Sequence, residues 1–195
     1  MRYKRTVFYM PPTATKYMTN NQGHIASEKT KRVILIGTSH EYQTRHADSN
    51  LKEIEQFKNM LIEECSANAV RLIAEEMHEE ALAENASKSV TQEVAIKLNI
   101  QHDFSEMSRK ERAEAGVIPY IEVMAWQMKW SEQEKMLNGR KSHAIREKYW
   151  LNKLRLLDLW PALFICGADH TEFFRTLLCD NGIEVVIAFS DWAPT

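Results

Sequence analysis

A short apolar run that ends in Gly-x-x-His occurs twice in this chain. The first copy runs from Val33 to His40 as VILIGTSH, and the second runs from Leu163 to His170 as LFICGADH. A short apolar run without polar alternation predicts a strand that is covered on both faces, as in a parallel sheet. The repeat therefore predicts two buried strands, each of which delivers a histidine just beyond its carboxyl end.

The stretches between the two copies predict helices and further strands in alternation. Apolar residues at steps of three and four predict a helix over 50–67. Further helices are predicted over 79–86, 90–98, 109–115, 125–160 and 169–180, the long one with a break at Asn138-Gly139. Further strands are predicted over 5–10, 70–74, 100–104 and 183–189, whereas 117–124 fits either a strand or the start of a helix. Ser49 and Ser108 are the predicted caps of two helices, and Glu111 completes a capping box with Ser108.

This order of elements predicts the fold class. Strand, helix and strand in succession require right-handed crossovers, so we expect an α/β fold: a mostly parallel central sheet flanked by helices in a single compact domain. A chain of 195 residues can bury such a core without disulfides. We expect residues 1–30 to form a polar N-terminal arm and residues 31–195 to form the domain that carries both Gly-x-x-His motifs.

Composition excludes several classes of partner and location. The net charge of −2 predicts no nucleic-acid partner, and no apolar run approaches the roughly 20 residues of a membrane span. The three cysteines, Cys65, Cys166 and Cys179, form no CxxC pair. They are expected to be free thiols in a reducing cytoplasm, with Cys166 a core residue rather than a nucleophile.

The position of the two histidines predicts a binding crevice. Ligands of open α/β sheets bind beyond the carboxyl ends of the strands, where Gly37 and Gly167 would let a ligand approach the backbone. Two histidines there can share a metal ion or divide acid and base work near neutral pH. The alternative is that His40 and His170 are structural residues that cap strand ends.

Carboxylates follow two of the other predicted strands at the same sheet edge. Glu75 and Glu76 follow the strand over 70–74, and we favour Glu76 as the one that points into the site. Two histidines and a carboxylate are a common metal-ligand set, so His40, His170 and Glu76 are also the candidate ligands of a divalent metal ion. Asp103 is a weaker candidate for ligand binding, since it can equally cap a turn.

The motifs, taken in order, resemble a known superfamily. Gly37 to His40, Glu75-Glu76, Arg146 and Gly167 to His170 are similar to the pattern of the TraB/PrgY, Tiki, ChaN-like and erythromycin-esterase group, over most of the chain from Val33 to about Phe189. The resemblance is strongest to small bacterial and phage proteins without an assigned activity. It implies a site built from His40, a glutamate, Arg146 and His170. Without the resemblance, Arg146 would be interpreted as a surface residue of a helix.

Three functions follow as expectations. The first is a hydrolase of an ester or amide-type bond in a small-molecule or peptide substrate, with His40, His170, Glu76 and Arg146 as catalytic residues, with or without a metal. The second is a non-catalytic protein that binds a small ligand, a metal or haem in the same pocket, with haem suggested only by Met124, Met128 and Met136. The third is a structural or regulatory partner protein that forms a homodimer through the Trp-rich helix, which holds Trp126, Trp130, Trp150 and Trp160. No GxSxG, P-loop or GxGxxG motif occurs.

Overall fold

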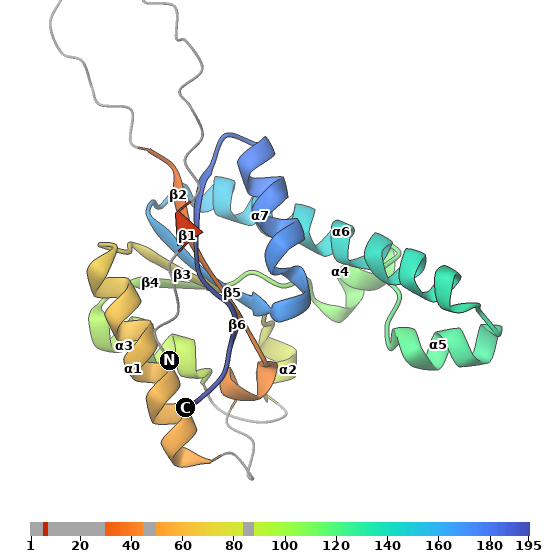
Figure 1. Cartoon of the computed structure of the whole chain (residues 1–195), viewed down its shortest axis with the longest axis horizontal. Coiled ribbons are helices and arrows are strands. Elements are labelled where there is room, and N and C mark those ends of the chain that lie inside the picture. The colour runs from red at the N-terminus through yellow and green to blue at the C-terminus, as the bar shows by residue number, and fades with distance from the viewer. Residues whose placement is uncertain (1–5, 8–29, 45–49, 84–87) are drawn as a thin grey trace, which may run out of the picture.

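The structure is a computed structural model that describes residues 6–7, 30–44, 50–83 and 88–195 (Figure 1). Its strands are β1 (Thr6–Val7), β2 (Arg32–Thr38), β3 (Leu72–Glu75), β4 (Gln101–Phe104), β5 (Ala162–Gly167) and β6 (Glu184–Trp192). Its α-helices are α1 (Leu51–Ala67), α2 (Glu79–Ala83), α3 (Val90–Leu98), α4 (Arg109–Glu114), α5 (Ile121–Met128), α6 (Glu132–Leu157) and α7 (Thr171–Asp180). Two 3₁₀ turns, η1 (His40–Tyr42) and η2 (Ala168–His170), follow β2 and β5.

The strands form one sheet in the order β1-β6-β2-β5-β3-β4. Five of them are parallel, and the short β1 pairs antiparallel with β6 at the edge. Helices α1 and α3 cover one face of the sheet, and α6 and α7 cover the other (Figure 1). The predicted class, an α/β fold with a mostly parallel sheet between helices, is therefore confirmed.

Alternate residues of the central strands enter two separate cores. In β2, Val33 and Leu35 pack beneath α6 and α7, whereas Ile34 and Ile36 pack beneath α1 and α3. All four side chains are completely buried. Both faces of β2 are therefore apolar, which explains why its sequence lacks the polar alternation of a half-exposed strand.

The register of the central strands aligns the two Gly-x-x-His motifs. Gly37 pairs with Cys166, and Thr38 pairs with Gly167, so β2 and β5 end together. The third strand, β3, ends beside them, because the backbone N–H of Glu76 donates to the carbonyl of Ile165 at 2.8 Å. Three adjacent parallel strands thus deliver their following residues to one edge of the sheet.

The predicted helix over 125–160 is wrong in where it breaks. Helix α6 continues through Asn138-Gly139, and the chain breaks instead between α5 and α6. There Lys129 adopts a left-handed conformation with φ of 54°, and Ser131 caps α6 in a capping box with Glu134. The ambiguous segment 117–124 contributes the first half of α5. Figure 1 shows α5 and the start of α6 extending away from the sheet as a helical hairpin.

Smaller differences concern the helix caps and the N-terminal segment. Ser108 and Glu111 form the predicted capping box of α4. Ser49 lies outside the described residues, and the side chain of Asn50 caps α1 in its place. Most of the predicted arm over residues 1–30 also lies outside the described residues, although Thr6–Val7 belongs to the sheet. None of the helices in the described part of the chain is long and apolar enough to cross a bilayer.

Candidate functional site

Residues from three strand ends and one long helix meet in an open pocket of about 400 Å³. His40 comes from η1 after β2, Glu76 from the segment after β3, His170 from η2 after β5, and Arg146 from the middle of α6. All four line the pocket. The residues that share this lining are Thr38, Ser39, His143, Gly167, Ala168, Asp169 and Asp191. The structure thus brings the four predicted catalytic residues together.

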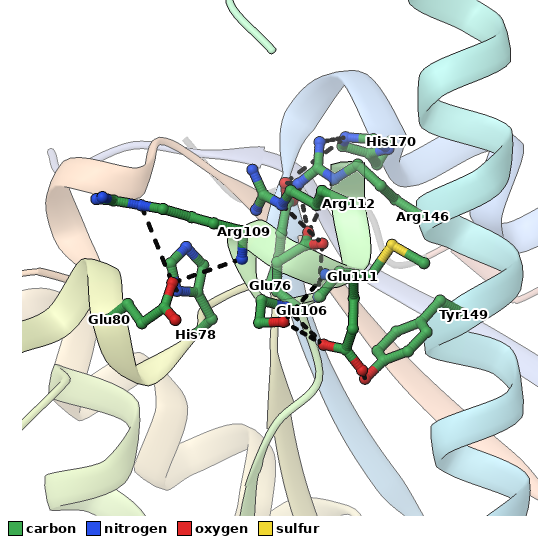
Figure 2. Close-up of polar contacts among 12 residues, drawn as sticks. Glu76, His78, Glu80, Glu106, Arg109, Glu111, Arg112, Arg146, Tyr149 and His170 are labelled. Atoms are coloured by element: carbon green, nitrogen blue, oxygen red, sulfur yellow. Dashed lines mark hydrogen bonds and ion pairs between the residues drawn. The ribbon is translucent and has the colours of Figure 1, made fainter. Parts of the chain in front are cut away.

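The carboxylate of Glu76 contacts the other three residues of this cluster, and Figure 2 shows it near Arg146 and His170. Its Oε1 accepts a hydrogen bond from Nη2 of Arg146 and lies 3.5 Å from Nε2 of His40 and 3.7 Å from Nε2 of His170. Its Oε2 accepts the backbone N–H of Gly167 at 2.7 Å. The side chain of Glu76 is only 3% exposed, so these groups replace the water that a carboxylate would otherwise bind.

A second glutamate, Glu106, fixes Arg146 from the other side (Figure 2). Its Oε2 accepts from Nε of Arg146 at 2.9 Å and from Nη2 at 2.5 Å, and its Oε1 lies 3.4 Å from Nε of Arg112. Glu106 follows β4 by two residues and is buried. Glu106 was not predicted as a site residue, although it comes after a strand end just as Glu76 does.

Charge pairing sets the protonation states in the cluster. Burial alone would raise the pKa of the Glu76 carboxyl, but attraction to Arg146 and His40 outweighs it and holds that pKa well below its usual range. The hydrogen bond and charge of Glu76 raise the pKa of His40 to about 9, against the opposing effect of burial. Burial alone would lower the pKa of Arg146, but the charges and hydrogen bonds of Glu76 and Glu106 outweigh it and raise that pKa above its usual value. At neutral pH, Glu76 is therefore anionic, and both His40 and Arg146 are cationic.

The two motif histidines have different partners behind them. Nδ1 of His40 lies 2.7 Å from Oε1 of Gln43, and Nε2 of Gln43 donates to Glu75 at 3.2 Å. Because the amide nitrogen of Gln43 donates to Glu75, its oxygen is the acceptor for an Nδ1–H of His40. The side chain of His40 is 52% exposed.

His170, by contrast, is buried and held by a carboxylate. Its Nδ1 lies 2.9 Å from Oε1 of Glu147, which also pairs with both terminal nitrogens of Arg140 at 2.8 and 2.6 Å. Burial would raise the pKa of Glu147, but the hydrogen bond from Arg140 and that of His170 lower it. Gln43 and Glu147 were not predicted, because neither belongs to a recognisable motif.

A third histidine, His143, lines the same pocket from α6. It lies one turn before Arg146, is half-buried, and packs its ring against His170 with the centroids 4.2 Å apart. Burial lowers the pKa of His143, and the nearby His170 and Arg146 lower it further, so the ring is neutral at neutral pH. His143 was not among the predicted site residues.

The remaining candidates do not line the pocket. Glu75 points to a polar cluster behind the site, where its Oε1 accepts from Ser89 at 2.5 Å and lies 2.8 Å from Nε2 of His102. Asp103 contacts Ser105 at 2.7 Å and Lys153 at 3.4 Å. These two residues support the site or the fold from outside the pocket.

The two motif glycines also differ in what surrounds them. A side chain at Gly37 would collide with the carbonyl of Ser190 and the hydroxyl of Thr171, so this glycine allows β6 and α7 to approach β2. A side chain at Gly167 would face Nε2 of His40 at 3.3 Å and Oε2 of Glu76 at 3.5 Å. Of the two glycines predicted to contact a ligand, Gly167 lines the pocket.

The predicted metal set does not fit this arrangement. Nη2 of Arg146 donates to Glu76, and Nη1 lies 3.3 Å from Nε2 of His170, so one guanidinium already contacts both the carboxylate and one of the histidines. Within the described residues, no group of three His, Cys, Asp or Glu side chains is arranged to hold a metal ion. A metal held by His40, His170 and Glu76 stays a prediction, and it would require Arg146 to move.

The haem and dimer interpretations concern residues outside the pocket. Met128 and Met136 lie exposed on the helical hairpin rather than along the pocket. Trp150 and Trp160 are buried core residues, whereas Trp126 is 82% exposed on α5. The predicted Trp-rich surface therefore reduces to the hairpin.

Comparison of the chain with models of known families, with curated proteins and with solved structures finds no match.

Proposed function

We propose that this protein is a hydrolase that cleaves an ester or amide-type bond in a small-molecule or peptide substrate. The observation that carries this proposal is the buried carboxylate of Glu76, which pairs with two cations, His40 and Arg146, at the wall of one pocket. Fixed cations at a pocket wall stabilise the negative charge that develops on a carbonyl oxygen during attack by water. The resemblance to the erythromycin-esterase group agrees with this reaction class.

Both cations have hydrogen-bonding capacity left for a substrate. Nε2 of His40 is 3.5 Å from Glu76, which is an ion pair rather than a strong hydrogen bond, and its ring is half exposed. Nη1 of Arg146 carries two N–H groups and has one partner among the described residues, His170. These two donors can bind the carbonyl oxygen together as negative charge develops on it.

The alternative is a protein that binds a ligand in this pocket without turning it over.

The free thiols of Cys65, Cys166 and Cys179 support our proposal that the protein works in the cytoplasm. The homodimer is a separate proposal, supported by the exposed Trp126, and light scattering tests it. The metal proposal is tested by elemental analysis of untagged protein.

A substrate panel with matched variants tests the hydrolase proposal. Aryl esters, lactones, short peptides and phosphoesters are offered to the wild-type protein and to His40→Ala, Arg146→Lys and His78→Ala. Wild type should hydrolyse an ester or amide, and His40→Ala should reduce kcat/KM about 10²- to 10³-fold. His78 lies outside the pocket, so His78→Ala should keep full activity. Binding measured by calorimetry without turnover would favour the alternative, and equal activity of His40→Ala would contradict the proposal.

A further inference from the structure

Three histidines line the pocket, and they differ in how many ring nitrogens are already bound. His40 uses Nδ1 toward Gln43 and Nε2 toward Glu76. His170 uses Nδ1 toward Glu147 and Nε2 toward Arg146 and Glu76. His143 makes no hydrogen bond from either nitrogen to the rest of the chain that the structure describes, and its ring packs against the ring of His170.

These contacts leave His40 and His170 without a lone pair for a reacting water. Nδ1 of His40 donates to the amide oxygen of Gln43, and its Nε2 faces the carboxylate of Glu76 at 3.5 Å, which only accepts, so both ring nitrogens carry N–H groups. Arg146 has no acceptor, so Nε2 of His170 must accept the N–H of Arg146, with Nδ1–H donated to Glu147. The one lone pair of the His170 ring therefore already accepts a hydrogen bond from Arg146.

His143 has the position that a base requires. It stands on α6 one turn before Arg146 and lines the same pocket as the two cations, so a carbonyl held by the cations lies within the pocket that His143 borders. Arg146 and Glu147 approach it from its own helix, His170 from η2, and Glu76 from the segment after β3. The pocket is open, which gives water access to the free nitrogens.

We infer that His143 is the general base of the proposed hydrolysis. Its free ring nitrogen takes a proton from water while the water oxygen forms a bond with the carbonyl carbon, and the carbonyl electron pair moves to the oxygen beside His40 and Arg146. When that pair returns, the bond to the leaving group breaks, and the leaving group takes the proton from His143. Water is consumed, and an acid and an alcohol or amine are released. This inference rests on the proposed function.

Kinetics of His143 variants test the inference on the substrate that wild type hydrolyses best. His143→Gln should lower kcat about 10²- to 10⁴-fold with KM changed less than threefold, because a base acts in the transition state rather than in substrate binding. Added imidazole should restore part of the activity of His143→Ala. His78→Ala is the matched histidine control and should be unchanged. A His143→Gln protein that keeps more than a tenth of wild-type kcat overturns the inference and leaves the hydrolase proposal standing.

The reactivity of the histidine rings in the wild-type protein tests the same inference without any substitution. Diethyl pyrocarbonate acylates a histidine nitrogen that carries an accessible lone pair, and peptide mass spectrometry at pH 7 locates the products. We expect His143 to react at least tenfold faster than His170, which is 4% exposed and fully bonded. Equal protection of the two rings overturns the inference. If wild type hydrolyses nothing on the panel, the proposed function and this inference fall together.

Discussion

The two Gly-x-x-His turns share a sequence pattern and a place at the sheet edge, but they build opposite environments. The first turn presents His40 half exposed and pairs it with a neutral amide, Gln43. The second buries His170 and pairs it with the anionic Glu147. Both rings lie within 4 Å of the same oxygen of Glu76. The motif therefore fixes where a histidine goes, and the partner behind the ring decides what the histidine can do.

Removing the shared carboxylate should produce the largest effect. Glu76→Gln leaves the buried Arg146 and the charged His40 without their common anion, so we expect the free energy of unfolding to fall by about 3 kcal/mol. Activity should be lost with it. Chemical denaturation measures the change, and Glu63→Gln at an exposed site of α1 is the control. A loss below 1 kcal/mol would mean that Glu76 is not the common anchor of both turns.

The two motif glycines should separate stability from activity. Gly37→Ala forces a methyl group against the backbone of Ser190, so it should lower the free energy of unfolding by about 3 kcal/mol. Gly167 has an ordinary φ of −59°, and a methyl group there meets His40 and Glu76 at 3.3 and 3.5 Å. Gly167→Ala should lower the free energy of unfolding by only about 1 kcal/mol. Its main effect should be on activity, because the methyl group enters the pocket. Thermal denaturation of both variants checks the order, which the reverse result would contradict.

The sequence could specify the strand ends because the central residues of β2 and β5, Val33–Ile36 and Ala162–Cys166, are all apolar. It placed His40, His170 and Glu76 at one edge for the same reason, whereas Arg146 entered only through a resemblance. Sequence patterns could not find Gln43 or Glu147, because their roles depend on which atom lies opposite after folding. The position of His143, one turn before Arg146, is a usable signal only once α6 is known to face the pocket.

The break between α5 and α6 has a sequence signal that was not used in the prediction. Ser131-x-x-Glu134 is a capping box, which predicts the start of α6 where the structure has it. Asn138-Gly139 instead suggested a break, but a glycine inside a helix costs only about 1 kcal/mol, and 26 residues of helix packed at their far end offset it. The packing of α6 therefore outweighs the low helix propensity of Asn138-Gly139.

Replacing the partner behind each ring compares the two turns directly. Glu147→Gln leaves Arg140 and His170 without an anion and should lower the free energy of unfolding by about 2 kcal/mol. Gln43→Leu removes one hydrogen bond of His40 at similar volume and should cost about 1 kcal/mol. Denaturant titration of both variants gives the two values. Equal losses would mean that the charged and neutral partners support their histidines to the same extent.

The smallest effect should appear in the pH dependence of stability that His40 contributes. The pKa of His40 in the folded protein is raised to about 9, above the value of about 6.5 expected in the unfolded chain. Its contribution is therefore fully present below pH 6.5 and is lost as the pH rises through 9. Because the side chain is half exposed, solvent screening limits this contribution to about 1 kcal/mol. The difference in unfolding free energy between wild type and His40→Gln should shrink by that amount from pH 6 to pH 10, and a constant difference would mean that His40 is not held as a cation.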